Sequence, residues 1–150
     1  MVRLSAIEDF LSQHSIAVVG VSRSQHKFGT MVFKDLKERK YDAIPVNPSA
    51  EELYGMKCYP TVTELPPTVT AAVFIVPPEQ ATEGVRQAIA RGIRRLWLQP
   101  GAESEEAIAH GVREGIDVIH GECILMFLKD TGFIHKLHKG LHKLTGSLPR

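Results

Sequence analysis

The chain has 150 residues, a length that suits one domain with a single hydrophobic core. Hydrophobic residues make up 43% of it, and the net charge of +1 gives no overall attraction to nucleic acid or to acidic membranes. No apolar run reaches membrane-spanning length, and the first residues lack the apolar core of a signal peptide. Two cysteines, Cys58 and Cys123, form no disulfide framework or zinc signature, so we expect a reduced, cytoplasmic protein.

The first third of the chain predicts two helices and two strands in alternation. Ser5 is expected to cap a helix that runs to about Gln13, because apolar residues recur on one face of that segment. An apolar strand follows at about 16–20. A polar loop then leads to a helix at about 29–39 and to a second strand at about 42–46.

The middle of the chain predicts one long strand and one long helix after a mostly irregular stretch. Residues 57–59 suit a short strand at the sheet edge, and 62–65 suit a single helical turn before two prolines. A buried strand is expected at about 71–76. The helix after it covers 79–91, and Gly92 is well placed as its C-terminal cap.

The last predicted elements repeat the same alternation. A strand is expected at about 94–98, and Ser104 is expected to cap a helix at 105–114 that Gly115 ends. A sixth strand is expected at about 116–119. Helical connections of this length favour right-handed crossovers, so the sequence predicts a Rossmann-like three-layer α/β sandwich with a mostly parallel sheet in the order 3-2-1-4-5-6.

We expect this domain to cover residues 1–130 and a basic extension rich in His and Lys to cover 131–150. His135 and His138 are helically adjacent, which makes metal binding conceivable. No carboxylate joins these histidines and lysines alternate with them, so a solvated or partner-covering extension is the favoured interpretation, with no metal site.

Five apolar runs each end in a short turn built from Gly, Pro, Asn or Ser. If the runs are parallel strands, all of these turns lie along one edge of the sheet, where ligands bind in open α/β folds. The crevice between the first and fourth strands is the expected site. The turns are Gly20-Val21-Ser22, Asn47-Pro48, Pro77-Pro78, Gln99-Pro100-Gly101 and His120-Gly121-Glu122-Cys123.

The first turn has the residues of an anion site that suits phosphate. Gly20 lacks a Cβ, so backbone or ligand can approach closely, and a helix that begins near Gly29 directs free N–H groups toward the crevice. The alternative is that both glycines only make a tight turn between strand and helix, because Ser22 replaces the second glycine of a full dinucleotide motif. The expected donors and cations are Ser22, Arg23, Ser24, Gln25 and Lys27.

The second and third turns each have two interpretations. Asn47 stands where a nicotinamide-dinucleotide site usually has a carboxylate, so NAD is disfavoured, and the amide can bond a ribose, an adenine or a phosphate. Asn47 can equally be a turn former before Pro48. Pro77 and Pro78 make a rigid apolar lip or simply begin the next helix.

The last turns are less specific. Gln99 places a polar side chain at a strand end, and Cys123 is either a small buried hydrophobe or a thiol that faces the crevice. The sequence predicts that Cys58 is an edge-strand residue without a partner. No nucleophile, base and orienting residue occur in a recognised pattern, so we expect no catalytic residues.

In combination these residues resemble a known family. The stretches Val19–Ser22, Ile44–Pro48 and Trp97–Gly101, with Gly55 and Cys123-Ile124, are similar to the small stand-alone CoA-binding proteins and to the CoA-binding domain of the succinyl-CoA synthetase α subunit. The resemblance covers roughly residues 10–128.

The resemblance implies a role in CoA binding for each turn. The first turn would hold the phosphates, the second would flank the nucleotide half, the third would line the groove, and the last two would lie toward the pantetheine and its sulfur. The loop after the fourth strand is similar to the synthetase type, which leaves phosphate neutralisation to Arg23 and Lys27. The implied ligand residues are Gly20, Val21, Ser22, Arg23, Ser24, Lys27, Gly29, Asn47, Pro48, Val76, Pro77, Pro78, Gln99, Gly101 and Cys123.

Non-catalytic binding of coenzyme A or an acyl-CoA is therefore the expected function. One alternative is a subunit of an acyl-CoA ligase that acts with a partner chain, because the Pro77-Pro78 loop is similar to the synthetase type. Another is an NAD(H)-binding sensor, although one short helix before the first strand is too little for a DNA-binding head. We expect no nucleic acid or membrane partner, and a protein partner or homo-oligomer stays open.

Overall fold

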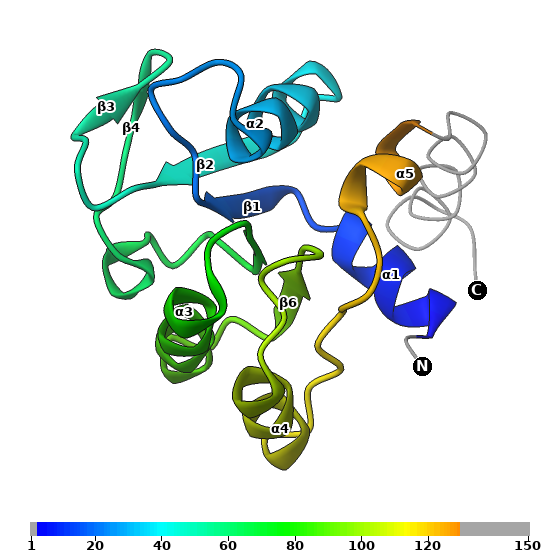
Figure 1. The fold of residues 1–150 in the computed structure, drawn as a ribbon. Helices are drawn as coiled ribbons and strands as arrows, with labels where there is room; N and C mark the ends of the chain where they lie inside the picture. Colours follow the sequence, from blue (N-terminus) through cyan, green and yellow to red (C-terminus); the bar gives the residue numbers. More distant parts are fainter. Residues whose placement is uncertain (1–2, 130–150) are drawn as a thin grey trace.

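A parallel sheet of four strands forms the centre of the computed structural model, which describes residues 3–129 (Figure 1). Its strands are β1 (Ser15–Val19), β2 (Asp42–Val46), β5 (Ala71–Phe74) and β6 (Arg95–Leu98), and they lie in the order β2-β1-β5-β6. Nearly every strand residue is buried, as expected for a parallel sheet that is covered on both faces.

Single bridges extend the sheet by one position at each side. Tyr59 pairs in parallel with Val46 beyond β2, and Ile119 pairs in parallel with Trp97 beyond β6. The Rossmann-like order 3-2-1-4-5-6 is thereby confirmed. The third and sixth positions are bridges rather than full strands.

The segment before Tyr59 forms a hairpin that the sequence did not predict. β3 (Glu52–Leu53) pairs antiparallel with β4 (Met56–Lys57), and Tyr54 and Gly55 make the turn between them. The predicted edge strand at 57–59 is therefore reduced to a single bridge, because Lys57 pairs within the hairpin and only Tyr59 pairs with the sheet.

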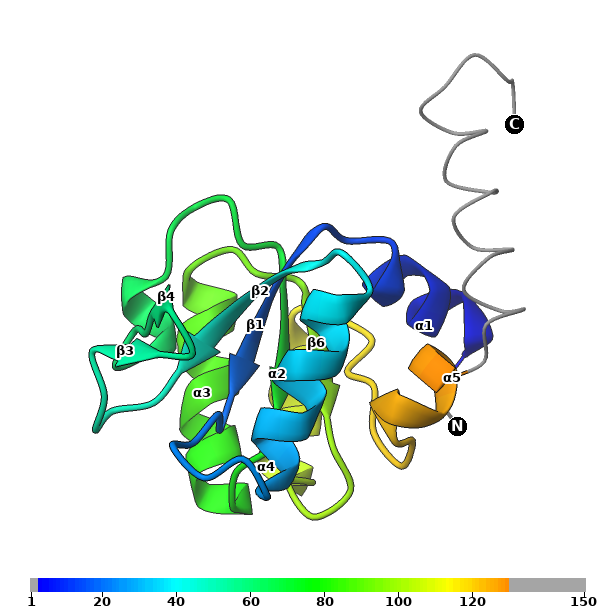
Figure 2. The ribbon, with the colours of Figure 1, turned by 90° about the horizontal axis from the view of Figure 1, so that it is seen from above.

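Helices cover both faces of the sheet, which gives three layers (Figures 1 and 2). α1 (Leu4–Leu11), α2 (Phe28–Glu38) and α5 (Ile124–Lys129) pack on one face. α3 (Pro78–Ala90) and α4 (Glu105–Arg113) pack on the other.

Side chains along each strand alternate between the two faces of the sheet, so the apolar core is divided into one cluster on each face. Ile16 and Val18 of β1 join the cluster under α1, α2 and α5, whereas Ala17 between them joins the cluster under α3 and α4. β5 behaves in the same way, with Val73 on the first face and Phe74 on the second. Because successive side chains of a strand point to opposite faces, each continuous apolar run contributes residues to both core clusters.

The start of α1 corrects one prediction. Ser5 does not cap this helix, because Arg3 occupies the N-cap with an extended backbone and makes no side-chain cap bond. Burial of Ile7, Phe10 and Leu11 fixes the helix instead, and it ends at Leu11 rather than near Gln13.

Other predicted helix boundaries agree with the structure. The Ser104 hydroxyl accepts a hydrogen bond from the Ala107 amide at 3.1 Å and so caps α4. Pro78 is the first residue of α3, and Gly92 follows that helix with a φ of 87°. A single 3₁₀ turn, η1, covers Val62–Glu64 as expected.

Two further observations concern only residues 3–129. None of the helices there has both the length and the apolar composition needed to cross a bilayer. Nor do three His, Cys, Asp or Glu side chains gather there to hold a metal ion. The predicted extension with His135 and His138 lies outside the described residues.

Tyr41 ties the end of α1 to the start of β2, and its environment predicts a dependence of stability on pH. The hydroxyl donates to the Leu11 carbonyl at 2.5 Å, and burial raises the pKa of Tyr41 from 10.0 to about 12, with the Arg39 charge acting in the opposite direction. Between pH 10 and 12 the unfolded chain loses this proton while the folded chain keeps it.

The folded wild type should therefore lose stability over that interval, and Tyr41→Phe should lose less. We expect the stability difference between the two proteins to change by about 1 kcal/mol between pH 9 and pH 11 in urea unfolding. The buried Cys58 thiol also has a raised pKa, but it is present in both proteins and cancels from the comparison. Identical pH profiles would contradict the prediction.

Candidate binding site

A cavity of about 400 Å³ lies at the carboxyl ends of β1 and β2. From β1 the chain proceeds to β2 on one side and later returns to β5 on the other, so this is the point where the strand order reverses. We call it the switch-point cavity. Its lining comes from the strand ends, the segment before η1 and the face of α3: Val19, Gly20, Val21, Ser22, Val46, Asn47, Pro48, Pro60, Thr61, Val62, Val76, Gln80, Glu83, Gly84 and Gln87.

Gly20 and Gly29 allow two close backbone contacts beside this cavity. A Cβ at Gly20, where φ is 117°, would lie 2.2 Å from the Ile75 carbonyl oxygen. A Cβ at Gly29 would lie 2.1 Å from the carbonyl oxygen of Gly20. Both glycines therefore make the tight turn that brings the start of α2 against the end of β1. A tight turn between strand and helix is the alternative role that the sequence suggested for them.

Asn47 fastens the segment between β1 and α2, residues 20–27, which we call the β1–α2 loop. Its amide nitrogen donates to the Val21 carbonyl at 2.7 Å, and its amide oxygen accepts from the Ser49 amide at 2.7 Å. Asn47 thus forms its own turn and holds the neighbouring loop, while the half-buried side chain lines the cavity.

Ser22 is fixed by hydrogen bonds to its own main chain. Its amide donates to the Thr30 hydroxyl at 3.2 Å, and that hydroxyl donates to the Ser22 carbonyl at 3.0 Å. The Ser22 hydroxyl accepts from the amide of Ser24 at 2.9 Å. The loop and the first turn of α2 therefore form one hydrogen-bonded unit at the mouth of the cavity.

The positive end of α2 has no acidic residue to offset it. Lys27 is its N-cap, with no side-chain cap bond, and its first turn contains no carboxylate. The other two helices that follow strands at this edge differ, because the first turn of α3 contains Glu79 and the first turn of α4 contains Glu105 and Glu106. Among these three helices, α2 is the one whose dipole and free amides favour a bound anion.

The predicted cations lie beside the cavity and do not line it. Arg23 donates to the Ser49 carbonyl at 2.9 Å, and both Arg23 and Lys27 are exposed. Glu83 is the one charged side chain in the lining, and it contacts Arg86 at 3.6 Å and Gln87 at 3.3 Å. The charge for an anion would therefore come from the exposed side of the β1–α2 loop.

The third turn lies partly at the cavity. Val76 lines it, whereas Pro77 is the N-cap of α3 and Pro78 its first residue, and both prolines are exposed. Their structural role as a helix start agrees with one of the two interpretations of this turn.

Gln99, Gly101 and Cys123 do not line the switch-point cavity. The buried Gln99 amide accepts from the Ile124 amide at 2.7 Å and donates to the Cys123 sulfur at 3.4 Å. Cys123 is half-buried against the core cluster of α2 and α5, and Gly101 is an exposed turn residue with a φ of 101°. This group connects the end of β6 to α5.

Cys58 has a partner, which corrects its interpretation as an unpartnered edge residue. It is buried, and its sulfur lies 3.6 Å from the Asn47 carbonyl oxygen. Burial raises the pKa of the Cys58 thiol, and the Asn47 contact and the Arg23 charge oppose that shift. Cys58 supports the turn that carries Asn47.

Sequence reasoning missed the α3 face of the cavity and one loop support. Gln80, Glu83 and Gln87 recur at helical spacing, a pattern that also describes any solvated helix face. A glycine inside a predicted helix is a sequence signal of close packing. The structure explains it at Gly84, where a Cβ would lie 2.6 Å from the Phe74 ring. Tyr54, whose hydroxyl donates to the Ser22 carbonyl at 2.7 Å, had no signal in its local sequence.

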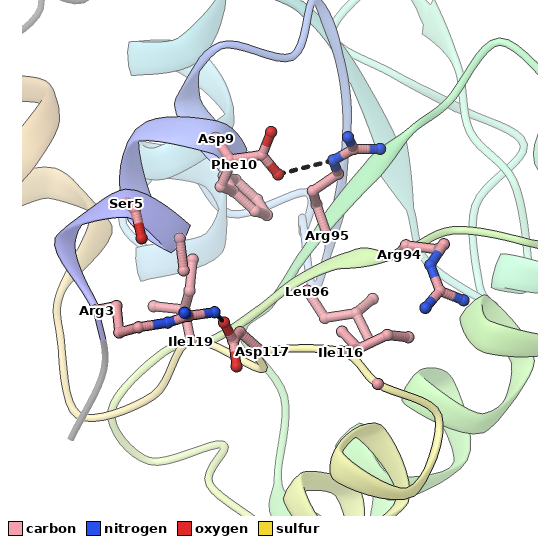
Figure 3. A pocket seen from close by; sticks show the side chains of 12 residues that line it. Arg3, Ser5, Asp9, Phe10, Arg94, Arg95, Leu96, Ile116, Asp117 and Ile119 are labelled. Atoms are coloured by element: carbon pink, nitrogen blue, oxygen red, sulfur yellow. Dashed lines mark hydrogen bonds and ion pairs between the residues drawn. The ribbon is translucent and has the colours of Figure 1, made fainter.

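A second cavity, of about 300 Å³, lies between α1 and the start of β6 (Figure 3). Its arginines already have partners: Arg3 pairs with Asp117, Arg95 pairs with Asp9 at 2.9 Å, and Arg94 donates to a main-chain carbonyl. Of these pairs, Arg95–Asp9 joins β6 to α1. The switch-point cavity, beside an uncompensated helix end, is therefore the stronger candidate site.

Comparisons with known proteins place the chain in a family. A family model described as a CoA binding domain matches residues 14–129. The α subunit of ADP-forming acetate–CoA ligase II from Pyrococcus furiosus is 34% identical in an alignment of 129 positions that covers 79% of this chain and 28% of that protein. ADP-forming acetate–CoA ligase II from Archaeoglobus fulgidus is 30% identical over 102 residues, which are 67% of this chain and 15% of that protein. The chain thus spans less than a third of the length of these ligases.

Shorter proteins are similar over most of their length. An uncharacterized protein of Bacillus subtilis is 29% identical over 109 residues, which are 81% of that protein. A conserved hypothetical protein from Pyrococcus furiosus has a solved structure with a TM-score of 0.72 and 40% identity, covering 75% of this chain and 97% of that one. On the family match and these likenesses, the chain belongs to the CoA binding domain family.

Proposed function

We propose that this chain binds coenzyme A or an acyl-CoA at the carboxyl edge of its sheet and carries out no reaction of its own. The observation that supports this most directly is the switch-point cavity next to an α2 amino end without acidic residues. Membership of the CoA binding domain family supports the identity of the ligand.

The adenosine half fits the cavity. A space of about 400 Å³ lies within the usual range for small-molecule sites, and valines and prolines from three segments give it apolar walls. Polar groups on the α3 face, Gln80 and Gln87, offer donors and acceptors to the edge of a purine. With the adenine base inside the cavity and the ribose at its mouth, the phosphates would lie beside Ser22.

The phosphates fit the β1–α2 loop. Side chains bond the carbonyls of Val21 and Ser22, which directs these oxygens toward the protein rather than toward an anion. The amides at the start of α2 and the exposed cations Arg23 and Lys27 then face the ligand with favourable charge.

The rest of the ligand would extend over the rim. Val76, Pro77 and Pro78 form an apolar edge next to the cavity for the pantetheine arm. Gln99, Gly101 and Cys123 lie beyond the cavity on the β6 side, where we place the thiol end of that arm.

We place the protein in the cytoplasm, because its cysteines Cys58 and Cys123 are free thiols.

A non-catalytic role agrees with how the polar side chains at the cavity are used. The Asn47 side chain bonds the main chain of Val21 and Ser49, and the Ser22 hydroxyl bonds the amide of Ser24. A general base or nucleophile needs such groups free toward the substrate.

One specific observation favours a second candidate function, that of a CoA-holding subunit in a ligase. The relative from Pyrococcus furiosus is the α subunit of an acetate–CoA ligase, at 34% identity over 79% of this chain. Copurification of an ATP-dependent partner together with thioester turnover would favour this candidate over the solitary binder.

Ligand titrations provide the first prediction of the proposed function. CoA at one hundred times its dissociation constant should add about 2.7 kcal/mol to the free energy of unfolding and raise the melting temperature by roughly 5–10 °C. Acetyl-CoA should behave similarly, whereas NAD and FAD should give smaller shifts. Melting curves that no CoA compound alters would refute the proposal.

Substitutions at Asn47 provide the second prediction. Asn47→Ala and Asn47→Asp both remove the donor to the Val21 carbonyl, but only the aspartate adds a negative charge beside the phosphates. We expect Asn47→Asp to bind CoA at least tenfold more weakly than Asn47→Ala in titration calorimetry at low salt. The difference should shrink at 0.5 M salt, because screening weakens repulsion at this exposed edge. Equal affinities for the two variants would place the phosphates elsewhere.

A further inference from the structure

The β3–β4 hairpin presents an unusual residue to the β1–α2 loop. Its two turn residues, Tyr54 and Gly55, both have positive φ, at 52° and 77°, which defines the tight turn that usually contains Asn, Asp or Gly. A tyrosine in this conformation is an outlier that costs conformational free energy. Such an outlier points to a role for the side chain.

Contacts hold the Tyr54 side chain in one direction. Its ring lies 6.0 Å from the Phe33 ring between centroids, and the Lys34 ammonium lies 4.8 Å from its centroid. The hydroxyl donates to the Ser22 carbonyl at 2.7 Å. Figure 1 shows the hairpin next to the loop that joins β1 to α2. A side chain packed on α2 therefore reaches the loop from outside.

The Ser22 carbonyl is the point where three elements meet. It accepts from Tyr54 of the hairpin and from Thr30 of α2, while the preceding Val21 carbonyl accepts from Asn47 after β2. These bonds hold the Val21 and Ser22 carbonyl oxygens toward the protein rather than toward a ligand. Loss of the Tyr54 donor would leave the Thr30 hydroxyl as the one remaining side-chain donor to the Ser22 carbonyl, and the more weakly held peptide could then turn its oxygen toward a bound phosphate.

We propose that Tyr54 is a positioning residue, which holds the β1–α2 loop in the shape that binds a pyrophosphate by donating its hydroxyl to the Ser22 carbonyl. The inference rests on the proposed function, because it assigns the phosphates of the ligand to this loop. Tyr54 touches no ligand atom and acts through the main chain of Ser22.

The test compares Tyr54→Phe with the wild type and with a matched control, Tyr59→Phe. Tyr59 is a half-buried tyrosine outside the cavity lining, and its ring contacts the Lys57 ammonium. Affinities for adenosine, ADP and CoA are measured in phosphate-free buffer. We expect Tyr54→Phe to weaken ADP and CoA about threefold to tenfold and to leave adenosine within about twofold, while Tyr59→Phe changes none of them.

Hydrogen exchange in the free proteins gives a readout that needs no ligand. Amides of residues 22–27 should exchange faster in Tyr54→Phe than in the wild type or in Tyr59→Phe. Unchanged ADP and CoA affinities, an equal loss for adenosine, or unchanged exchange would each overturn the inference. A wild type that binds none of the three ligands would instead overturn the proposed function, and the exchange measurement would then decide alone whether Tyr54 holds the loop.

Discussion

The close approach of β1 to the segment after β5 is the constraint on which the rest of the site depends. Gly20 leaves β1 in a conformation that favours glycine and lies against the Ile75 carbonyl, with no room for a Cβ. Gly29 then lies against Gly20 in the same way and sets the start of α2 directly above the end of β1. These two backbone contacts fix where α2 begins relative to the end of β1, beside the cavity that Gly20 lines.

The sheet order was predictable because it depends on patterns that cover many residues. Four apolar runs separated by helix-length segments leave little freedom, since right-handed crossovers and burial on both faces select one arrangement. Single boundaries were less predictable. Ser5 has the chemistry of a cap, but burial of Phe10 and Leu11 decides where α1 begins and ends. Residues 57–59 have strand character that the hairpin turn at Tyr54 and Gly55 largely redirects.

The same contrast applies to the site. Ser22 and Asn47 follow directly from strand ends, and the topology brings both to the cavity. Gln99 also follows a strand end, yet its amide bonds to Ile124 and Cys123, and nothing in the local sequence distinguishes these two outcomes. The α3 residues Gln80 and Gln87 were missed because a helix face toward a cavity and one toward solvent have the same periodicity.

Polar groups at this edge mostly bond to the main chain of the loops around the switch-point cavity. The lining of the switch-point cavity comes from the strand ends and the turns after them, from residues 60–62 and from α3, all inside the segment that the family model matches. A site built in this way needs no side chain from a further domain in order to form. It also leaves no free nucleophile or base among Ser22, Asn47 and Thr30, whose groups bond to the loop. These bonds suit a site that holds a ligand, in keeping with the proposed function.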